Sequence, residues 1–217
     1  MIDQSQGKQI YKKRDEILRV AKKLFSEKGY NNTSMRDIVK EAHTSMGNLY
    51  FHFPNKLTIL KLICREFIYK LRSQIYQIHR LNFSPQTGFA IDFRIGYITT
   101  LEDPKLSRLW LVARNIPEIH RFSFENKRIR LRTFFGDRIP EEELDFLAIA
   151  IQGIADAIFE QKKNENLHGD SVRLSNKIIS YSLKLIGYSD NEIQKAINEA
   201  EDYVTKKHIS TDPYFEF

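Results

Sequence analysis

Apolar residues recur at intervals of three and four along almost the whole chain, which is the spacing that lines one face of an α-helix. In residues 10–28, for example, Ile17, Leu24 and Phe25 share such a face, and Gly29 follows as a helix terminator. No segment combines alternating apolar residues with the β-branched runs that are typical of strands. The pattern therefore predicts an all-α protein with about nine or ten helices.

Capping residues and turn formers mark where these helices begin and end. Thr33, Ser45 and Asn55 each precede an apolar stripe and can cap the free N–H groups of a helix. Prolines and glycines divide the remainder of the chain. The predicted helices cover residues 10–28, 34–41, 45–53, 55–80, 86–101, 104–115, 117–134, 141–163, 171–186 and 189–207.

Positive charge is concentrated in the first third of the chain. Residues 1–80 contain 16 Lys and Arg against 7 Asp and Glu, whereas residues 81–217 contain 18 against 21. This asymmetry indicates an N-terminal segment that meets a polyanion, either nucleic acid or an anionic membrane surface. Composition alone does not choose between the two.

The sequence lacks the features that are typical of membrane and secreted proteins. No window holds the ~18–20 consecutive apolar residues of a membrane span, and the first residues lack the apolar stretch of a signal peptide. The single cysteine, Cys64, excludes an intramolecular disulfide and fits a reducing compartment. We therefore expect a cytoplasmic protein without a membrane partner.

Common catalytic motifs are also missing. The sequence has no phosphate-binding glycine loop, no HExxH pair and no G-x-S-x-G turn, and its six histidines are scattered. We expect no catalytic residue, no metal site and no cofactor. A helical enzyme and a basic protein on anionic membranes stay as alternatives, although the latter favours an uninterrupted amphipathic helix.

The turn Ala42-His43-Thr44-Ser45 joins two short predicted helices, 34–41 and 45–53, and a longer helix, 10–28, supports them. This is the layout of a helix-turn-helix. The major groove of DNA is ~12 Å wide and admits one helix, whose N-terminal side chains then reach the base edges. The second short helix is therefore the predicted recognition helix.

Many positions in residues 10–60 fit one pattern: Ile17-Leu18, Ala21, Leu24-Phe25, Gly29-Tyr30, Thr33-Ser34-Met35-Arg36-Asp37-Ile38, Ala42, Ser45-Met46-Gly47-Asn48-Leu49-Tyr50-Phe51-His52-Phe53 and Lys56. With these residues the segment resembles the DNA-binding domain of TetR/AcrR-family transcriptional regulators. The resemblance implies a homodimeric regulator that binds a palindromic operator in double-stranded DNA and responds to a small molecule. A repressor released by that molecule is the preferred interpretation, and the sequence does not distinguish it from an activator. The resemblance also implies a helix-turn-helix domain over residues 1–54 and a helical effector-binding and dimerisation domain over 55–217, with a connecting helix at about 55–80.

The resemblance assigns phosphate contacts to Tyr50 and Lys56. A lysine in the first turn of a helix adds its charge to N–H groups that already face an anion. The other DNA-binding candidates are Thr33 and Arg36 for phosphates, and Thr44, Ser45, Met46, Asn48 and His52 for base edges.

Asn48 is the preferred base reader, because an amide can pair with adenine N6 and N7. For Thr33 and Ser45, plain helix capping is an equal alternative.

Two further positions in this region invite a conformational interpretation. His43 stands where the family usually has glycine, so a positive φ at this turn would be slightly strained. Gly47 lowers helix propensity by ~1 kcal/mol relative to alanine. We therefore expect Gly47 to allow close approach of the backbone to DNA or to a neighbouring helix.

The second half of the chain does not reveal its ligand. Aromatic residues are dense between residues 86 and 135, and most of them belong to the core by the usual behaviour of buried aromatics. The candidate effector-binding residues are Phe89, Phe93, Tyr97, Trp110, Arg114 and His120, which suit an apolar or amphipathic small molecule. For Trp110, Arg114 and His120, a packed tryptophan beside surface polar groups is the alternative.

Dimerisation is expected through helices 141–163 and 171–186. Both are strongly apolar, and Ala148, Gly153 and Ala157 permit close approach of a partner helix. The acidic run at residues 141–143 is interpreted as favourable charge in a first helical turn.

Overall fold

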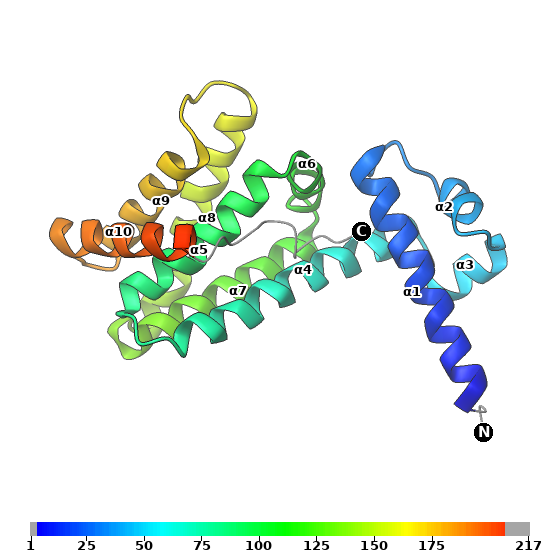
Figure 1. Ribbon diagram of the computed structural model, residues 1–217, viewed down its shortest axis with the longest axis horizontal. Helices are drawn as coiled ribbons and strands as arrows, with labels where there is room; N and C mark the ends of the chain where they lie inside the picture. Colours follow the sequence, from blue (N-terminus) through cyan, green and yellow to red (C-terminus); the bar gives the residue numbers. More distant parts are fainter. Residues whose placement is uncertain (1–3, 207–217) are drawn as a thin grey trace.

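The computed structural model describes residues 4–206, and in this range the backbone forms ten α-helices, one short 3-10 helix and no strand (Figure 1). The predicted all-α fold is thus confirmed. No helix in this range is long and apolar enough to cross a membrane. The elements are α1 (Gln4–Glu27), α2 (Met35–Glu41), α3 (Met46–His52), α4 (Lys56–His79), α5 (Pro85–Glu102), α6 (Pro104–Ala113), α7 (Pro117–Phe135), η1 (Gly136–Arg138), α8 (Glu141–Lys163), α9 (Ser171–Leu185) and α10 (Asp190–Lys206).

Side chains cap the helices near the tight turn. Ser45 and Asn55 accept hydrogen bonds from the backbone N–H groups at the starts of α3 and α4, as predicted. The predicted cap at Thr33 is wrong, because Ser34 caps α2 and forms a reciprocal capping box with Asp37. The predicted last helix reaches residue 207, which lies outside the described residues.

The N-terminal unit consists of α1, α2 and α3 packed around one apolar core (Figure 1). Ile17, Ile38 and Leu49 are fully buried in it. The same core continues into the first turns of α4 and into one face of α6, which contributes Leu109 and Ala113. The core of the N-terminal unit therefore continues past residue 54. The domain boundary expected at that residue stays a prediction.

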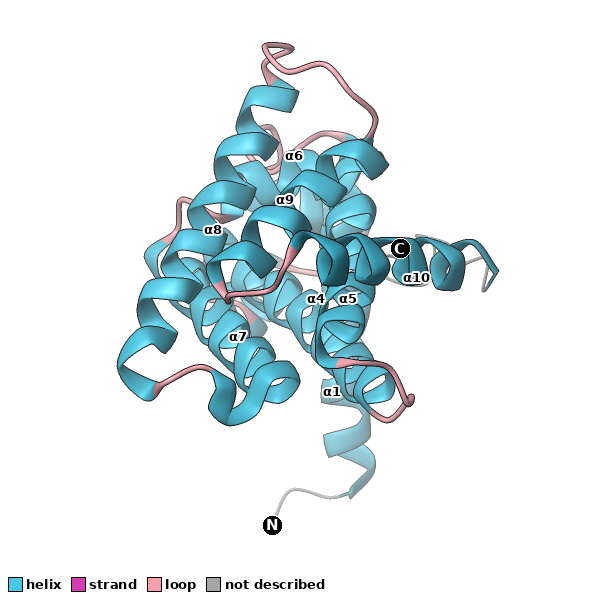
Figure 2. Cartoon of the chain, turned by 90° about the vertical axis from the view of Figure 1, so that its left-hand side faces the viewer, coloured by secondary structure: helices cyan, strands magenta, loops and turns pink. Residues whose placement is uncertain are grey.

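The C-terminal bundle is built around α5, which packs against α4, α6, α7, α9 and α10 (Figure 2). A fully buried arginine, Arg94, ties three of these helices together. Its Nη2 donates hydrogen bonds to Asn176 Oδ1 of α9 and to the Ile197 carbonyl of α10, and it lies 3.5 Å from Glu201 Oε2. Buried charge is tolerated here because it is hydrogen-bonded and paired.

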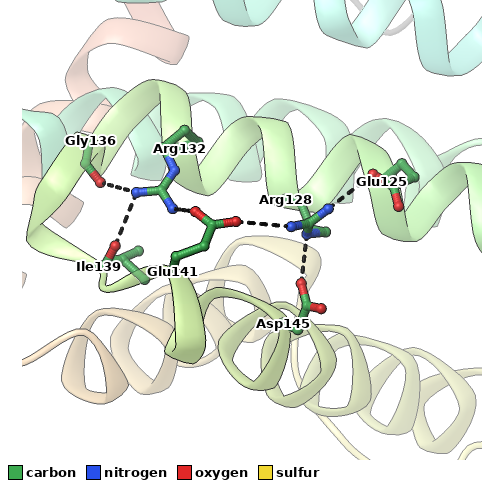
Figure 3. A network of polar contacts seen from close by, with 7 residues as sticks. All are labelled: Glu125, Arg128, Arg132, Gly136, Ile139, Glu141 and Asp145. Atoms are coloured by element: carbon green, nitrogen blue, oxygen red, sulfur yellow. Dashed lines mark hydrogen bonds and ion pairs between the residues drawn. The ribbon is translucent and has the colours of Figure 1, made fainter.

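A network of ion pairs braces α7 against α8 (Figure 3). Arg128 Nε lies 2.6 Å from Asp145 Oδ1, and Glu141 is paired with both Arg128 and Arg132. Arg132 Nη1 also donates to the Gly136 carbonyl at 2.9 Å. Glu141 therefore has specific partners in addition to its place in the first turn of α8.

Candidate functional site

The turn between α2 and α3 adopts the geometry that the sequence suggests. His43 is exposed and has a φ of 44°, in the left-handed region that favours glycine. The backbone N–H of Thr44 donates to the Val39 carbonyl at 3.1 Å, and Lys13 Nζ of α1 donates to the Ala42 carbonyl at 3.0 Å. His43 therefore has a φ at which histidine is less favourable than glycine, and the turn is tied to α1.

Polar groups at the start of α3 are linked to one another. Ser45 Oγ accepts from the backbone N–H of Asn48 at 3.1 Å, so its capping role is confirmed. Asn48 Nδ2 donates to Thr44 Oγ1 at 2.8 Å. This contact holds the Asn48 amide at the N-terminal end of α3, where base edges would be read.

The outer face of α3 is aromatic and solvent-exposed. Tyr50 is 49% exposed and Phe51 is 71% exposed. Met46 and His52 are partly buried, and desolvation together with the Arg14 charge lowers the pKa of His52, which favours the neutral ring. Phe51 was missed by the sequence analysis, although its position two residues after the inward-facing Leu49 places it on the opposite face.

Gly47 lies on the same outer face and is exposed. The nearest atom to a Cβ built at this position is Ser45 Oγ, at 4.0 Å. No neighbouring helix of the described chain therefore approaches Gly47. Of the two predicted reasons for this glycine, the close approach of another helix of the same chain is wrong.

Lys56 has partners within the protein that the sequence did not predict. Its Nζ donates to the carbonyls of Tyr30 and Thr33 at 2.7 and 2.8 Å and lies 4.3 Å from the centre of the Tyr30 ring. Desolvation lowers the pKa of this ammonium group. Lys56 thus fixes the α1–α2 loop, and two of its three N–H groups are engaged.

The two phosphate candidates before the turn differ in accessibility. Thr33 is 1% exposed, and its hydroxyl donates to the carbonyls of Leu24 and Gly29. A phosphate cannot reach this side chain in the observed conformation. Arg36, on α2, is exposed.

Three of the six effector candidates, Phe93, Tyr97 and Trp110, line one cavity of about 100 Å³ between α4, α5, α6, α7 and α8. Phe89 is buried next to a smaller void that Phe93 also lines. Arg114 instead points along α8, where its guanidinium lies 2.8 Å from Glu160 Oε2.

His120 is exposed on α7. Neither His120 nor Arg114 lines this cavity, because the helical phase after Pro117 turns His120 to solvent and the Glu160 carboxylate holds Arg114.

Polar residues of α7 and α8 complete the cavity, and the sequence analysis missed them. They are Ser123, Asn126, Lys127, Arg130, Gln152 and Asp156. Burial lowers the pKa of Lys127 to about 8. Because α7 contains several arginine and lysine residues, its sequence does not indicate which of them faces the cavity.

Residues 17–63 match the family model described as bacterial regulatory proteins, tetR family, and so run from the middle of α1 to the first turns of α4. The N-terminal unit of this chain is thus similar to that of the tetR family of bacterial regulatory proteins. The matched residues include the turn between α2 and α3, the capped helix α3, and Lys56.

Two curated regulators are similar to parts of this chain. The transcriptional regulator YuxN of Bacillus subtilis is 31% identical over 114 residues, which cover 52% of this chain and 39% of YuxN. IcaR, the negative transcriptional regulator of the biofilm operon icaADBC of Staphylococcus aureus, is 44% identical over 108 residues, which cover 48% of this chain and 55% of IcaR. The chain therefore spans less than two thirds of the length of either relative.

A solved structure extends the likeness to the C-terminal bundle. RolR in complex with resorcinol has a TM-score of 0.68 and 19% sequence identity, and the match covers 88% of this chain and 95% of RolR. The two proteins therefore share the fold of both the N-terminal unit and the bundle.

Proposed function

We propose that this protein is a TetR-family, homodimeric transcriptional repressor that binds a palindromic DNA site and leaves it when a small apolar or amphipathic effector binds. The observation that carries the proposal is the exposed face of α3, a capped helix of seven residues held behind a tight turn. A short helix fixed at both ends is suited to enter a major groove. The excess of cations in residues 1–80 supplies the attraction to phosphate.

In this proposal some side chains of α2, α3 and the turn between them contact DNA phosphates, and others contact base edges. Tyr50 and Arg36 contact phosphates, while Asn48 reads a base with help from Thr44 and Ser45. Lys56 contributes through its remaining N–H group and by fixing the α1–α2 loop. Met46 and His52 border the same groove, whereas Thr33 is not included because its hydroxyl is buried.

Large apolar side chains on the surface of α8 and α9 support a homodimer. Phe146 and Ile149 on α8 are 70% and 59% exposed, and Tyr181 and Leu185 on α9 are about half exposed. No atom lies within 4 Å of a Cβ built at Gly153 in the isolated chain, so this part of α8 is open to a partner helix. Large exposed apolar side chains on two neighbouring helices favour association with a second copy.

The position of α6 supports a link between effector and DNA. Trp110 of α6 lines the cavity, while Leu109 and Ala113, on an adjacent side of the same helix, belong to the core of the N-terminal unit. Arg108 Nη2 also donates to the Ser26 carbonyl near the end of α1 at 3.3 Å. A ligand that displaces Trp110 would therefore move α6 and, with it, α1 and the attached α3.

Gel mobility tests the DNA-binding part of the proposal. A DNA fragment from upstream of the protein's own gene should shift at lower protein concentration than a random duplex of equal length, and vesicles of anionic lipid should bind no protein. Tyr50→Phe removes one phosphate-bonding hydroxyl and should therefore weaken the DNA shift. Tyr76→Phe, on the exposed side of α4, is the matched control and should leave the shift unchanged. Binding to vesicles without a DNA shift would favour the membrane alternative and reject the repressor.

A further inference from the structure

The cavity between α4, α5, α6, α7 and α8 contains hydrogen-bond donors that have no acceptor within the described residues. The Tyr97 hydroxyl and the Arg130 Nε–H are buried and make no hydrogen bond within the described residues. Lys127 Nζ donates to Ser123 Oγ at 3.1 Å, which leaves further N–H groups for another acceptor. Buried donors without partners are costly, so a ligand that supplies acceptors would be favoured here.

We propose that the effector of this protein is a small organic acid whose carboxylate is held by Lys127 and Tyr97, with Arg130 beside them. This inference rests on the proposed function, because it names the chemical class of the molecule that the cavity binds. Carboxylates accept several hydrogen bonds at once and form their strongest ones with cationic donors.

The charges around the cavity favour an anion over a cation. Its charged lining consists of two cations, Lys127 and Arg130, and one carboxylate, Asp156. Arg130 is paired with the fully buried Asp92 of α5, and Asp156 already accepts a hydrogen bond from Gln152 Nε2. Lys127 is thus left without an ion-pair partner of its own in the described chain.

The pKa of Lys127 is lowered chiefly by desolvation and further by Arg130, while Asp156 raises it. A carboxylate at Nζ would offset the desolvation that lowers this pKa.

The apolar part of the cavity sets the size and shape of the rest of the ligand. Phe67, Phe93, Trp110 and Phe159 come from α4, α5, α6 and α8 and provide apolar walls. The volume of about 100 Å³ compares with the ~150 Å³ of an apolar cavity that holds benzene in another protein. We therefore expect a single ring or a short chain, bound with a small outward shift of the walls.

The rival occupant is a cation that pairs with Asp156 and stacks on the aromatic walls. Three probes of nearly equal size separate these possibilities: benzoate, neutral benzamide and benzylammonium. Because the chain contains a single tryptophan, Trp110, and this residue lines the cavity, its fluorescence reports binding directly. The titrations use the full-length protein at pH 7 without DNA.

Benzoate should change the Trp110 fluorescence saturably, benzamide should bind at least tenfold more weakly, and benzylammonium should bind weakest. Lys127→Met should weaken benzoate binding at least tenfold and Tyr97→Phe several-fold, while Asp156→Asn should strengthen it. Lys195→Met, at an exposed position on α10, is the control for the loss of one positive charge and should leave benzoate binding unchanged.

Tighter binding of benzylammonium, equal binding of the three probes or no binding of any probe would overturn the inference. Unchanged benzoate affinity in Lys127→Met would also overturn it, and circular dichroism verifies that each variant is folded. The gel-mobility assay is independent of these titrations. A DNA shift without benzoate binding rejects only this inference, whereas benzoate binding without a DNA shift rejects only the proposed repressor.

Discussion

Alanine at position 47 is expected to stabilise the free protein and to weaken its binding to DNA. Glycine in a helix is destabilising by ~0.5–1 kcal/mol relative to alanine because of its backbone freedom. The new methyl group would lie 4.0 Å from Ser45 Oγ, an ordinary contact, so nothing within the chain opposes the substitution. Because Gly47 is in the first turn of α3, we expect the lower end, ~0.5 kcal/mol, and a rise in Tm of about 1–2 °C.

On the DNA side the same methyl group would separate the α3 backbone from the groove. We expect a loss of ~1 kcal/mol per half-site from displaced contacts, or ~2 kcal/mol for a dimer on two half-sites, which corresponds to about 30-fold weaker binding. Thermal unfolding measures the first effect, and a fluorescence-anisotropy titration of operator DNA measures the second. Protein that is more stable but binds DNA more weakly is the expected result.

The control for helix propensity is Asn198→Ala on the exposed side of α10, which should raise stability by a similar amount without affecting DNA binding. If Gly47→Ala binds operator DNA as tightly as the parent protein, α3 does not approach DNA through this face. The interpretation of Gly47 would then have to be abandoned.

Four further substitutions test other parts of the structure. His43→Gly should raise the free energy of unfolding by ~0.5–1 kcal/mol in urea titrations, because glycine relieves the positive φ; a decrease would contradict this. Asn48→Ala should narrow the gap between operator and random DNA by ~1–3 kcal/mol per half-site, and a change in the salt dependence alone would argue against base reading. The folded-state pKa of Lys127, about 8, is below its unfolded value, so the unfolded chain binds more protons above pH 8 and the free energy of unfolding should rise by ~2 kcal/mol between pH 8 and 10. Lys127→Met should remove this rise, and an unchanged slope would refute the assignment. Ala157→Glu should dissociate the proposed dimer and abolish operator binding together, and sedimentation of an intact variant dimer would place the interface elsewhere.

Local signals made the N-terminal unit predictable. Serine and asparagine before an apolar stripe can cap a helix whatever surrounds them, which is why Ser45 and Asn55 were identified correctly. Thr33 and Ser34 are adjacent hydroxyls, and only the S-x-x-D spacing to Asp37 distinguishes the second as the cap. The positive φ at His43 was suggested by the glycine that the resembling family usually has at this position, since histidine itself disfavours it.

The polar lining of the cavity could not be predicted from the sequence, because it is brought together by contacts between residues far apart in the chain. Lys127, Gln152 and Asp156 lie on helices whose charged residues would ordinarily face solvent, and nothing in their spacing shows that α5 and α6 cover them. The same holds for the hydrogen bonds of Lys56 to the α1–α2 loop, which connect two segments through tertiary structure. Aromatic residues were easier to place, because apolar rings are buried by default.

The contribution of α6 to the N-terminal core limits how this chain can recombine with its relatives. A fragment that ends within α4 would leave the surfaces that contact Leu109 and Ala113 open to water, and apolar surface of that kind promotes aggregation. A chimera that joins this N-terminal unit to another regulator's bundle would need a matching α6 face in the acceptor. The N-terminal unit is therefore discontinuous in sequence, because part of its core comes from α6. Exchange of the N-terminal segment alone would leave that core incomplete.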